Sequence, residues 1–166
     1  FSQLRYLIRT NPGFHRENVL VIRRSDALRD QLETFKQELL KNPNVVAVSH
    51  SRQLPGKNYS NNATFVEGKG MENTYLTWQD WIGFDYDKVF SLEMVDGRFF
   101  SRDISGDSTA VVINEAAVRS LGLEDPVPGK ALIGPTGQDS IVRIPIIGVL
   151  RDFHFKSLHL SIEPMA

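Results

Sequence analysis

The chain has 166 residues, of which 41% are hydrophobic and 23% are charged. These are ordinary proportions for a globular protein and exclude a disordered or fibrous chain. The net charge of −1 and the scattered lysines and arginines argue against a nucleic-acid-binding surface. The absence of cysteine excludes disulfides, thiol nucleophiles and cysteine-ligated metals.

The first expected elements are a helix and a strand. Phe1 to Arg9 carries leucine and isoleucine at helical spacing, and Asn11-Pro12-Gly13 is typical of a helix stop. No apolar run approaches the roughly 18 residues of a membrane-spanning helix, and the start is unlike a signal peptide. Asn18 to Ile22 is a compact apolar run that predicts a buried strand. The abrupt apolar start and the end at Ala166 indicate a piece of a longer protein.

A helix is expected next, with Ser25 and Asp26 as candidate caps. Its apolar stripe is Leu28, Leu32, Phe35 and Leu39. Charged residues, Lys36 among them, are expected to face water. Val45 to Val48 predicts a second strand, which gives a strand-helix-strand unit with parallel strands.

The middle of the chain begins with a polar stretch, Gln53 to Asn62, which predicts a mobile loop or a boundary between two lobes. Ala63 to Glu67 and Tyr75 to Ile82 are expected to be strands. Because Trp78 and Trp81 differ by an odd offset, one should lie in the core and the other in solvent.

Two further helices are expected after this point. Asp85 to Leu92 predicts a short helix with Phe90 and Met94 packed inward, and Asp96-Gly97-Arg98 predicts a turn. Ala110 to Ile113 predicts a strand that leads into a second helix.

That second helix has clear boundary signals. Asn114 is the expected cap, Ile113 and Val118 are spaced as a hydrophobic staple, and Gly122 suits the left-handed residue that closes the helix. The rest of the chain, with its long apolar run from Ile141 to Leu150, predicts two or three strands, with Pro145 at an edge or bulge.

Several residues invite a chemical interpretation. Gly129-Lys130 lacks the glycine and the Ser or Thr of a phosphate loop, and Gly68-Lys69-Gly70 has no following helix. Asp152, His154 and His159 could hold a metal, but their spacing matches no metal motif and a structural role is favoured.

Hydrolytic sites are equally weakly indicated. Ser49-His50-Ser51 lacks a nucleophile elbow. The acid pairs Asp85 with Asp87 and Asp103 with Asp107 are better explained by caps and turns than by a glycosidase site. We therefore predict no catalytic, cofactor-binding or metal-binding residue, no cofactor, and no enzymatic activity.

An ordered set of short motifs covers nearly the whole chain. It begins with Asn11-Pro12-Gly13-Phe14, Glu17 to Ile22, Pro43 to Ser49, Leu54-Pro55-Gly56 and Asp85-Tyr86-Asp87. It continues with Gly97 to Ser101, Val112 to Glu115, Leu121-Gly122, Pro128-Gly129-Lys130, Ile146 to Val149, Asp152 to Phe155 and Ile162-Glu163-Pro164. In this order the motifs resemble the periplasmic core domain of MacB-like, FtsX-like ABC transporter permeases.

The resemblance implies a mixed α/β (α+β) fold with two lobes. Residues 1–13 would be a juxtamembrane helix stub that continues the first membrane helix. Residues 14–52 would form a porter-like strand-helix-strand lobe, completed by residues near the C-terminus or beyond it. Residues 53–166 would form an inserted mixed α/β lobe and a C-terminal tail.

The resemblance also implies a function. The domain would lie on the periplasmic face of the bacterial inner membrane and couple ATP hydrolysis to transport or mechanical work. Its partners would be an ABC-type ATPase, the permease helices of the parent chain, and a periplasmic protein or lipoprotein, in a dimeric transporter without nucleic acid.

A different class of function stays open. A periplasmic ligand- or carbohydrate-binding domain without a transport role would use the loop from Gln53 to Asn62 and Trp78 as its pocket. It predicts a concave site where polar groups converge. A soluble domain that serves only in assembly is a third possibility.

Overall fold

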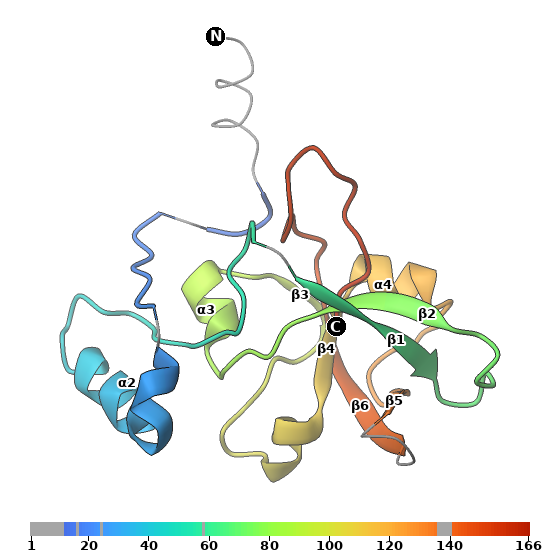
Figure 1. Cartoon of the computed structure of the whole chain (residues 1–166), viewed down its shortest axis with the longest axis horizontal. Helices are drawn as coiled ribbons and strands as arrows, with labels where there is room; N and C mark the ends of the chain where they lie inside the picture. The colour runs from blue at the N-terminus through green and yellow to red at the C-terminus, as the bar shows by residue number, and fades with distance from the viewer. Residues whose placement is uncertain (1–11, 16, 24, 58, 136–140) are drawn as a thin grey trace, which may run out of the picture.

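Six strands form one curled, mostly antiparallel sheet, with short helices around it (Figure 1). The computed structural model describes residues 12–15, 17–23, 25–57, 59–135 and 141–166. The mixed α/β class expected from the sequence is confirmed. The helix predicted over residues 1–9 lies outside the described residues.

The strand order is β2-β1-β5-β6-β3, and β4 also pairs with β6. The strands are β1 (Ser60–Val66), β2 (Tyr75–Gln79), β3 (Met94–Gly97), β4 (Val111–Asn114), β5 (Ala131–Pro135) and β6 (Ile141–Leu150). Only the pairing of β4 with β6 is parallel. Pro145 pairs with β5 just before the β4 register shifts between Ile146 and Gly148, which agrees with the predicted edge or bulge.

The last residues of the chain join the two ends of this sheet. The Trp78 amide on β2 donates to the Pro164 carbonyl at 2.9 Å, and the Ala166 amide donates back to Trp78 at 2.8 Å. On the other side, the Asn114 amide at the end of β4 donates to the Met165 carbonyl at 3.1 Å. The order β2-β1-β5-β6-β4 is thereby closed into a ring by residues 164–166.

The helix after β4 follows its sequence signals closely. Helix α4 (Glu115–Ser120) is capped by Asn114, whose Oδ1 accepts from the Ala117 amide at 2.9 Å. Gly122 has the expected left-handed φ of 56°. Lys69 Nζ donates to the carbonyl of Leu121 at 2.8 Å, which places a cation at the negative end of the helix.

Two clusters of buried side chains form the core. One packs α4 against the sheet and consists of Val66, Ile113, Ala117, Leu121, Leu123, Val127, Leu132, Ile146 and Val149. The other is mostly aromatic and consists of Tyr59, Tyr86, Phe90, Phe99, Val112, Leu150, Phe153 and Phe155. Trp78 packs against the aromatic cluster and Trp81 is 57% exposed, which confirms the prediction from their spacing. Helix α3 (Tyr86–Phe90) contributes two members of this cluster and confirms the short helix expected there.

The strands predicted at Asn18 to Ile22 and Val45 to Val48 do not form, so the predicted strand-helix-strand unit is wrong for this structure. Residues 18–22 and 45–48 are irregular. Leu20 is 85% exposed and Val46 is 92% exposed. An extended apolar segment becomes a buried strand only where another strand pairs with its backbone, and no described segment does so here.

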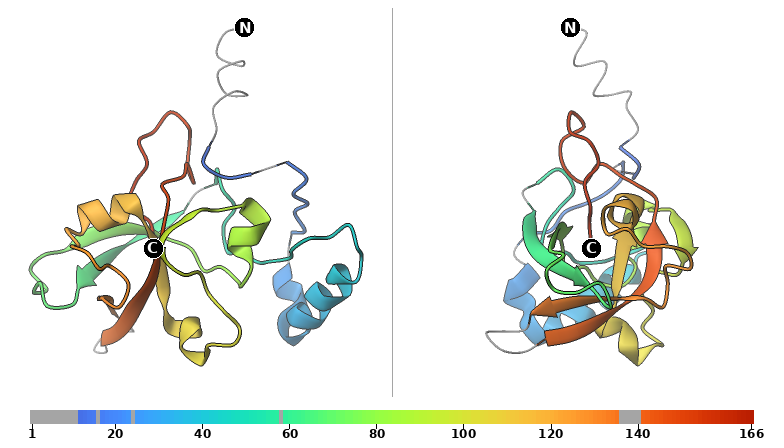
Figure 2. Two further views of the ribbon diagram at one scale, coloured as in Figure 1. Left: turned by 180° about the vertical axis from the view of Figure 1, so that it is seen from behind. Right: turned by 90° about the vertical axis from the view of Figure 1, so that its right-hand side faces the viewer.

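The helix between these segments differs from its prediction in two ways. It is divided into a 3-10 turn, η1 (Ser25–Gln31), and α2 (Leu32–Leu40), with a backbone kink at Arg29. The predicted apolar stripe is partly buried, but Lys36, expected in water, is only 1% exposed. In Figures 1 and 2 the hairpin formed by η1 and α2 lies to one side of the sheet.

The polar loop expected over Gln53 to Asn62 is shorter than predicted, because β1 already begins at Ser60. It is also anchored. The Gly56 amide donates to the Phe155 carbonyl at 2.8 Å, and the buried Tyr59 ring packs edge-on against Phe155 with centroids 5.1 Å apart. Close contact with the aromatic cluster therefore holds this loop on the core.

Candidate functional site

The serines and histidine of the Ser49-His50-Ser51 segment do not form a nucleophilic site. Ser49 Oγ donates to the Gly83 carbonyl at 3.1 Å, and Ser51 Oγ donates to the Gln53 carbonyl at 2.5 Å. Both hydroxyls are thus used to hold the segment against its neighbours. An activated serine would instead hydrogen-bond to a base.

The metal interpretation of Asp152, His154 and His159 is not supported. Asp152 accepts from the Ala116 amide at 2.8 Å and from Arg119 at 2.6 Å, so it secures the start of α4. His159 is exposed. Within the part of the chain that the structure describes, no group of three or more metal-binding side chains is present.

The acid pairs are divided between different partners. Asp85 pairs with Lys88 at 2.5 Å and lies 3.6 Å from Arg102. Asp107 is buried and receives both guanidinium nitrogens of Arg98 at 2.5 and 2.7 Å. Asp85 and Asp107 are thus held by cations, rather than by the helix caps and turns that the sequence indicated.

Both glycine-lysine motifs lie in turns. Gly68 and Gly70 both have left-handed φ angles, of 82° and 75°, and Lys69 between them reaches the end of α4. Gly129, with φ 99°, turns the chain into β5.

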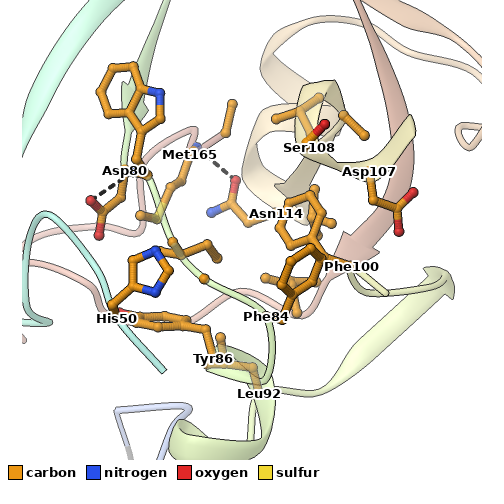
Figure 3. A pocket seen from close by; sticks show the side chains of 18 of the residues that line it. His50, Asp80, Phe84, Tyr86, Leu92, Phe100, Asp107, Ser108, Asn114 and Met165 are labelled. Carbon is orange, nitrogen blue, oxygen red and sulfur yellow. Dashed lines mark hydrogen bonds between the residues drawn. The ribbon is translucent and has the colours of Figure 1, made fainter. Parts of the chain in front are cut away.

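A pocket of about 320 Å³ lies where the aromatic cluster meets His50 and residues 80–84 (Figure 3). Five aromatic rings line it: Trp81, Phe84, Tyr86, Phe100 and Phe153. Its polar lining includes His50, Asp80 and Asn114. Neither the loop before β1 nor Trp78 lines it, so the cavity is not where the ligand-binding alternative placed its pocket.

Asp80 and His50 are unusual members of this lining. Asp80 Oδ1 accepts from the amides of Gln53 at 3.1 Å and Trp81 at 2.9 Å, whereas its buried Oδ2 has no partner. Burial raises the pKa of Asp80 to about 6, although these amides act in the opposite direction. Burial, helped by the charge of Lys36, lowers the pKa of His50, and its buried Nδ1 is also unpartnered.

A chain of charges connects α2 with the rest of the molecule beside this pocket. The buried Lys36 pairs with Glu33 at 3.0 Å, and Glu33 in turn pairs with Arg102 at 2.7 Å. The Arg102 guanidinium also stacks on Phe84, 5.0 Å from the ring centroid. Polar contacts of this kind thus contribute to holding the η1–α2 hairpin on the aromatic side of the sheet.

The segment before the hairpin is tied directly to the aromatic cluster. Phe14 packs edge-on against Phe90 and Phe153, with centroids 5.8 and 6.2 Å away. The backbone adds two hydrogen bonds of 2.7 Å, from the His15 amide to Phe90 and from the His154 amide to Pro12. Residues 12–15 therefore form an anchor, which we call the Pro12–His15 anchor.

The family model of the MacB-like periplasmic core domain matches residues 4–161. The chain belongs to this family. No curated protein matches the chain. Family membership places it on the periplasmic face of the inner membrane, as part of an ABC-type permease, and the family is a non-catalytic domain of such transporters.

Solved structures agree with this MacB-like fold. A domain of a putative permease from Porphyromonas gingivalis is 23% identical, with a TM-score of 0.51, over 78% of this chain and 52% of that one. The periplasmic region of MacB from Actinobacillus actinomycetemcomitans is 17% identical, with a TM-score of 0.54, over 81% of this chain and 61% of that one. The chain thus spans between half and two thirds of these relatives.

Within this MacB-like domain, the described helices include none that is both long and apolar enough to cross a membrane. Sequence reasoning missed the pocket residues Asp80 and His50 and the buried Lys36. The only signal for Asp80 was its place between two tryptophans, in Trp78-Gln79-Asp80-Trp81. Because burying a carboxylate among apolar side chains is costly, such a neighbourhood indicates an unusual acid.

Proposed function

We propose that this domain couples ATP hydrolysis by a cytoplasmic ABC-type ATPase to movement on the periplasmic side of the membrane. The observation that carries the proposal is the Pro12–His15 anchor. It joins the N-terminal segment to the aromatic cluster through two ring contacts and two backbone hydrogen bonds. If a membrane helix precedes residue 12, its displacement reaches the core directly.

The sheet and its two clusters of buried side chains, which receive this motion and which we call the body, are suited to transmit it. Residues 164–166 close the sheet, and buried side chains fill it on both sides of β6. Closely packed interiors are stiff, so a push on Phe14 displaces the body as a unit rather than deforming it locally. No catalytic chemistry is needed for this role.

We propose that residues 14–52 are part of a porter-like lobe whose remaining strands come from other parts of the permease, and that 53–166 are the inserted lobe. The exposed apolar segments around Leu20 and Val46 support this division. Hydrogen exchange should find both segments protected in the full-length permease and unprotected in this chain. Rapid exchange of both segments in the full-length permease would contradict the division.

We also propose that the permease works as a dimer, with an ABC-type ATPase and a periplasmic protein or lipoprotein as partners.

The coupling role is tested with Phe14→Ala in the full-length permease, assembled with its ATPase. We expect ATP hydrolysis to continue while nucleotide-dependent movement of the periplasmic domain is lost. Leu76→Ala is the matched control, because Leu76 is 61% exposed on β2 and far from the anchor in sequence. Normal movement in Phe14→Ala would contradict the proposal.

A further inference from the structure

Three segments that are far apart in the sequence meet at one end of the domain (Figures 1 and 2). They are the Pro12–His15 anchor, residues 54–57 and residues 154–163. The His154 amide donates to the Pro12 carbonyl at 2.7 Å, and the Gly56 amide donates to the Phe155 carbonyl at 2.8 Å. These backbone contacts make the three segments one surface, which we call the anchor end.

The charges of the anchor end are one-sided. The chain carries 20 acids among 166 residues, about one in eight, so an end with a single acid is unusual for this protein. That acid is Glu163, and it is paired with Lys156 at 2.6 Å. Lys57 is exposed and makes no ion pair with a described residue. The anchor end is therefore positive, with its one carboxylate already neutralised.

The sequence next to the anchor adds further positive charge. Arg5, Arg9 and Arg16 lie at most seven residues from the anchor, and the first acid of the chain is Glu17. Later in the chain, five of the six described arginines from residue 52 onwards pair with a carboxylate, and the sixth, Arg52, stacks on an aromatic ring. A run of basic residues without acids is the pattern of a segment that binds an anionic surface.

The loop from residue 156 to residue 163 gives the anchor end an apolar tip. Its two ends are joined by the Lys156–Glu163 ion pair, and the Leu160 amide donates to the Ser157 carbonyl at 3.0 Å. Leu160 is 49% exposed. In Figures 1 and 2 this loop, in red, projects from the sheet on the side where the described chain begins. An exposed leucine beside basic residues is suited to the boundary between lipid headgroups and acyl chains.

We propose that the anchor end binds the membrane surface, with its basic residues against the phosphate groups of anionic phospholipids and Leu160 at the headgroup boundary. Family membership places the domain on the periplasmic face of the inner membrane, so this surface is close to lipid. Negative phosphate groups complement an end that is positive and has no unpaired acid. The contact fixes the orientation of the domain on the bilayer, and it does not depend on the coupling role.

The test measures binding of the 166-residue chain to sedimented vesicles at about 0.1 M salt. One set of vesicles is phosphatidylcholine alone, and the other contains about 30% of the anionic phosphatidylglycerol. We expect saturable binding to the anionic set at millimolar lipid or below, and at least about tenfold weaker binding to the neutral set. About 0.5 M salt should remove the difference, because the Debye length then falls to about 4 Å.

Lys57→Glu is the decisive variant, and Lys41→Glu is its matched control. Both lysines are exposed and both changes alter the net charge equally, but Lys41 lies at the end of α2, outside the anchor end. One basic residue near the membrane surface contributes about fivefold to binding, so Lys57→Glu should weaken binding to anionic vesicles at least about tenfold. Lys41→Glu should weaken it less than about threefold.

Leu160→Glu tests the loop, with Leu76→Glu on β2 as its control because Leu76 is 61% exposed. Leu160→Glu should weaken binding at least about fivefold more than the control, while thermal unfolding shows all variants folded. Equal binding to the two sets of vesicles, or equal affinities of Lys57→Glu and Lys41→Glu, would overturn the proposal. Binding to neither set would also overturn it, and would leave an acidic protein as the partner of the anchor end.

Discussion

Replacing Asn114 by alanine should severely destabilise the domain, because this one side chain joins three parts of it. Its Oδ1 accepts from the amides of Ala117 on α4 and Met165 in the closing segment, both at 2.9 Å. Its Nδ2 donates to the Glu163 carbonyl, also at 2.9 Å, and the residue is 1% exposed. Loss of a helix cap costs about 1 kcal/mol, and each buried group left unpaired costs about 1–3 kcal/mol.

We therefore expect Asn114→Ala to lower the free energy of unfolding by about 3–5 kcal/mol. Asn114→Asp keeps the accepting oxygen but points a carboxylate at the Glu163 carbonyl, so it should lose about 2 kcal/mol or more. Urea unfolding followed by tryptophan fluorescence measures both, since Trp78 contacts the closing segment.

Asn42→Ala is the matched control, because its Oδ1 accepts one exposed hydrogen bond, from Asn44 at 3.0 Å. It should cost less than about 1 kcal/mol. The reasoning is refuted if Asn114→Ala costs no more than this control. It is also refuted if Asn114→Asp unfolds at the same urea concentration as the parent chain.

Three further changes test other parts of the structure. Gly148→Ala should cost about 3 kcal/mol in the same urea assay, because its Cβ would collide with the Arg98 carbonyl oxygen. Gly106→Ala, whose Cβ meets no atom within 4 Å, should be nearly neutral. The Arg98 guanidinium lowers the pKa of Asp107, so Asp107→Asn should cost about 3 kcal/mol at neutral pH, and unfolding curves should converge as the pH falls below about 4, where the stabilisation is lost. Burial raises the pKa of Asp80, so its stabilising protonated form is lost as the pH rises through about 6. The free energy of unfolding of Asp80→Asn should thus exceed that of the parent chain by up to about 3 kcal/mol at about pH 8 and equal it at about pH 4. Equal free energies of unfolding at both pH values would contradict this.

The sequence predicted best where local signals and packing agree. Asn114, Val118 and Gly122 mark the helix after β4 by capping, staple and left-handed closure, each of which depends only on neighbouring residues. The long run from Ile141 to Leu150 is readable because a strand paired on both sides is apolar over most of its length.

Strand prediction failed where pairing decides the structure. Asn18 to Ile22 and Val45 to Val48 have the composition of buried strands, but composition does not reveal whether a partner strand is present. Lys36 was misplaced for a related reason. A charged residue is expected in water, and the i,i+3 ion pair with Glu33 within α2 does not reveal that Lys36 is only 1% exposed.

The pocket could not have been predicted from spacing. Asp80 and His50 are 30 positions apart and line the same pocket because the segments 49–53 and 80–83 run together, with the Gly83 amide donating to the His50 carbonyl at 2.8 Å.

The coupling role is tested most directly by a distance measurement in the full-length permease with its ATPase. The 166 residues contain no cysteine, so a spin label can be introduced at the exposed Glu72 between β1 and β2, where it measures the distance between the two copies of the domain in the proposed dimer. A pair of labels at Glu72 and Asp103 within one copy is the control. We predict that the distance between the copies changes between the nucleotide-free and the vanadate-trapped states while the control distance stays constant. A distance between the copies that is the same in both states would contradict the proposal that this domain moves with ATP hydrolysis.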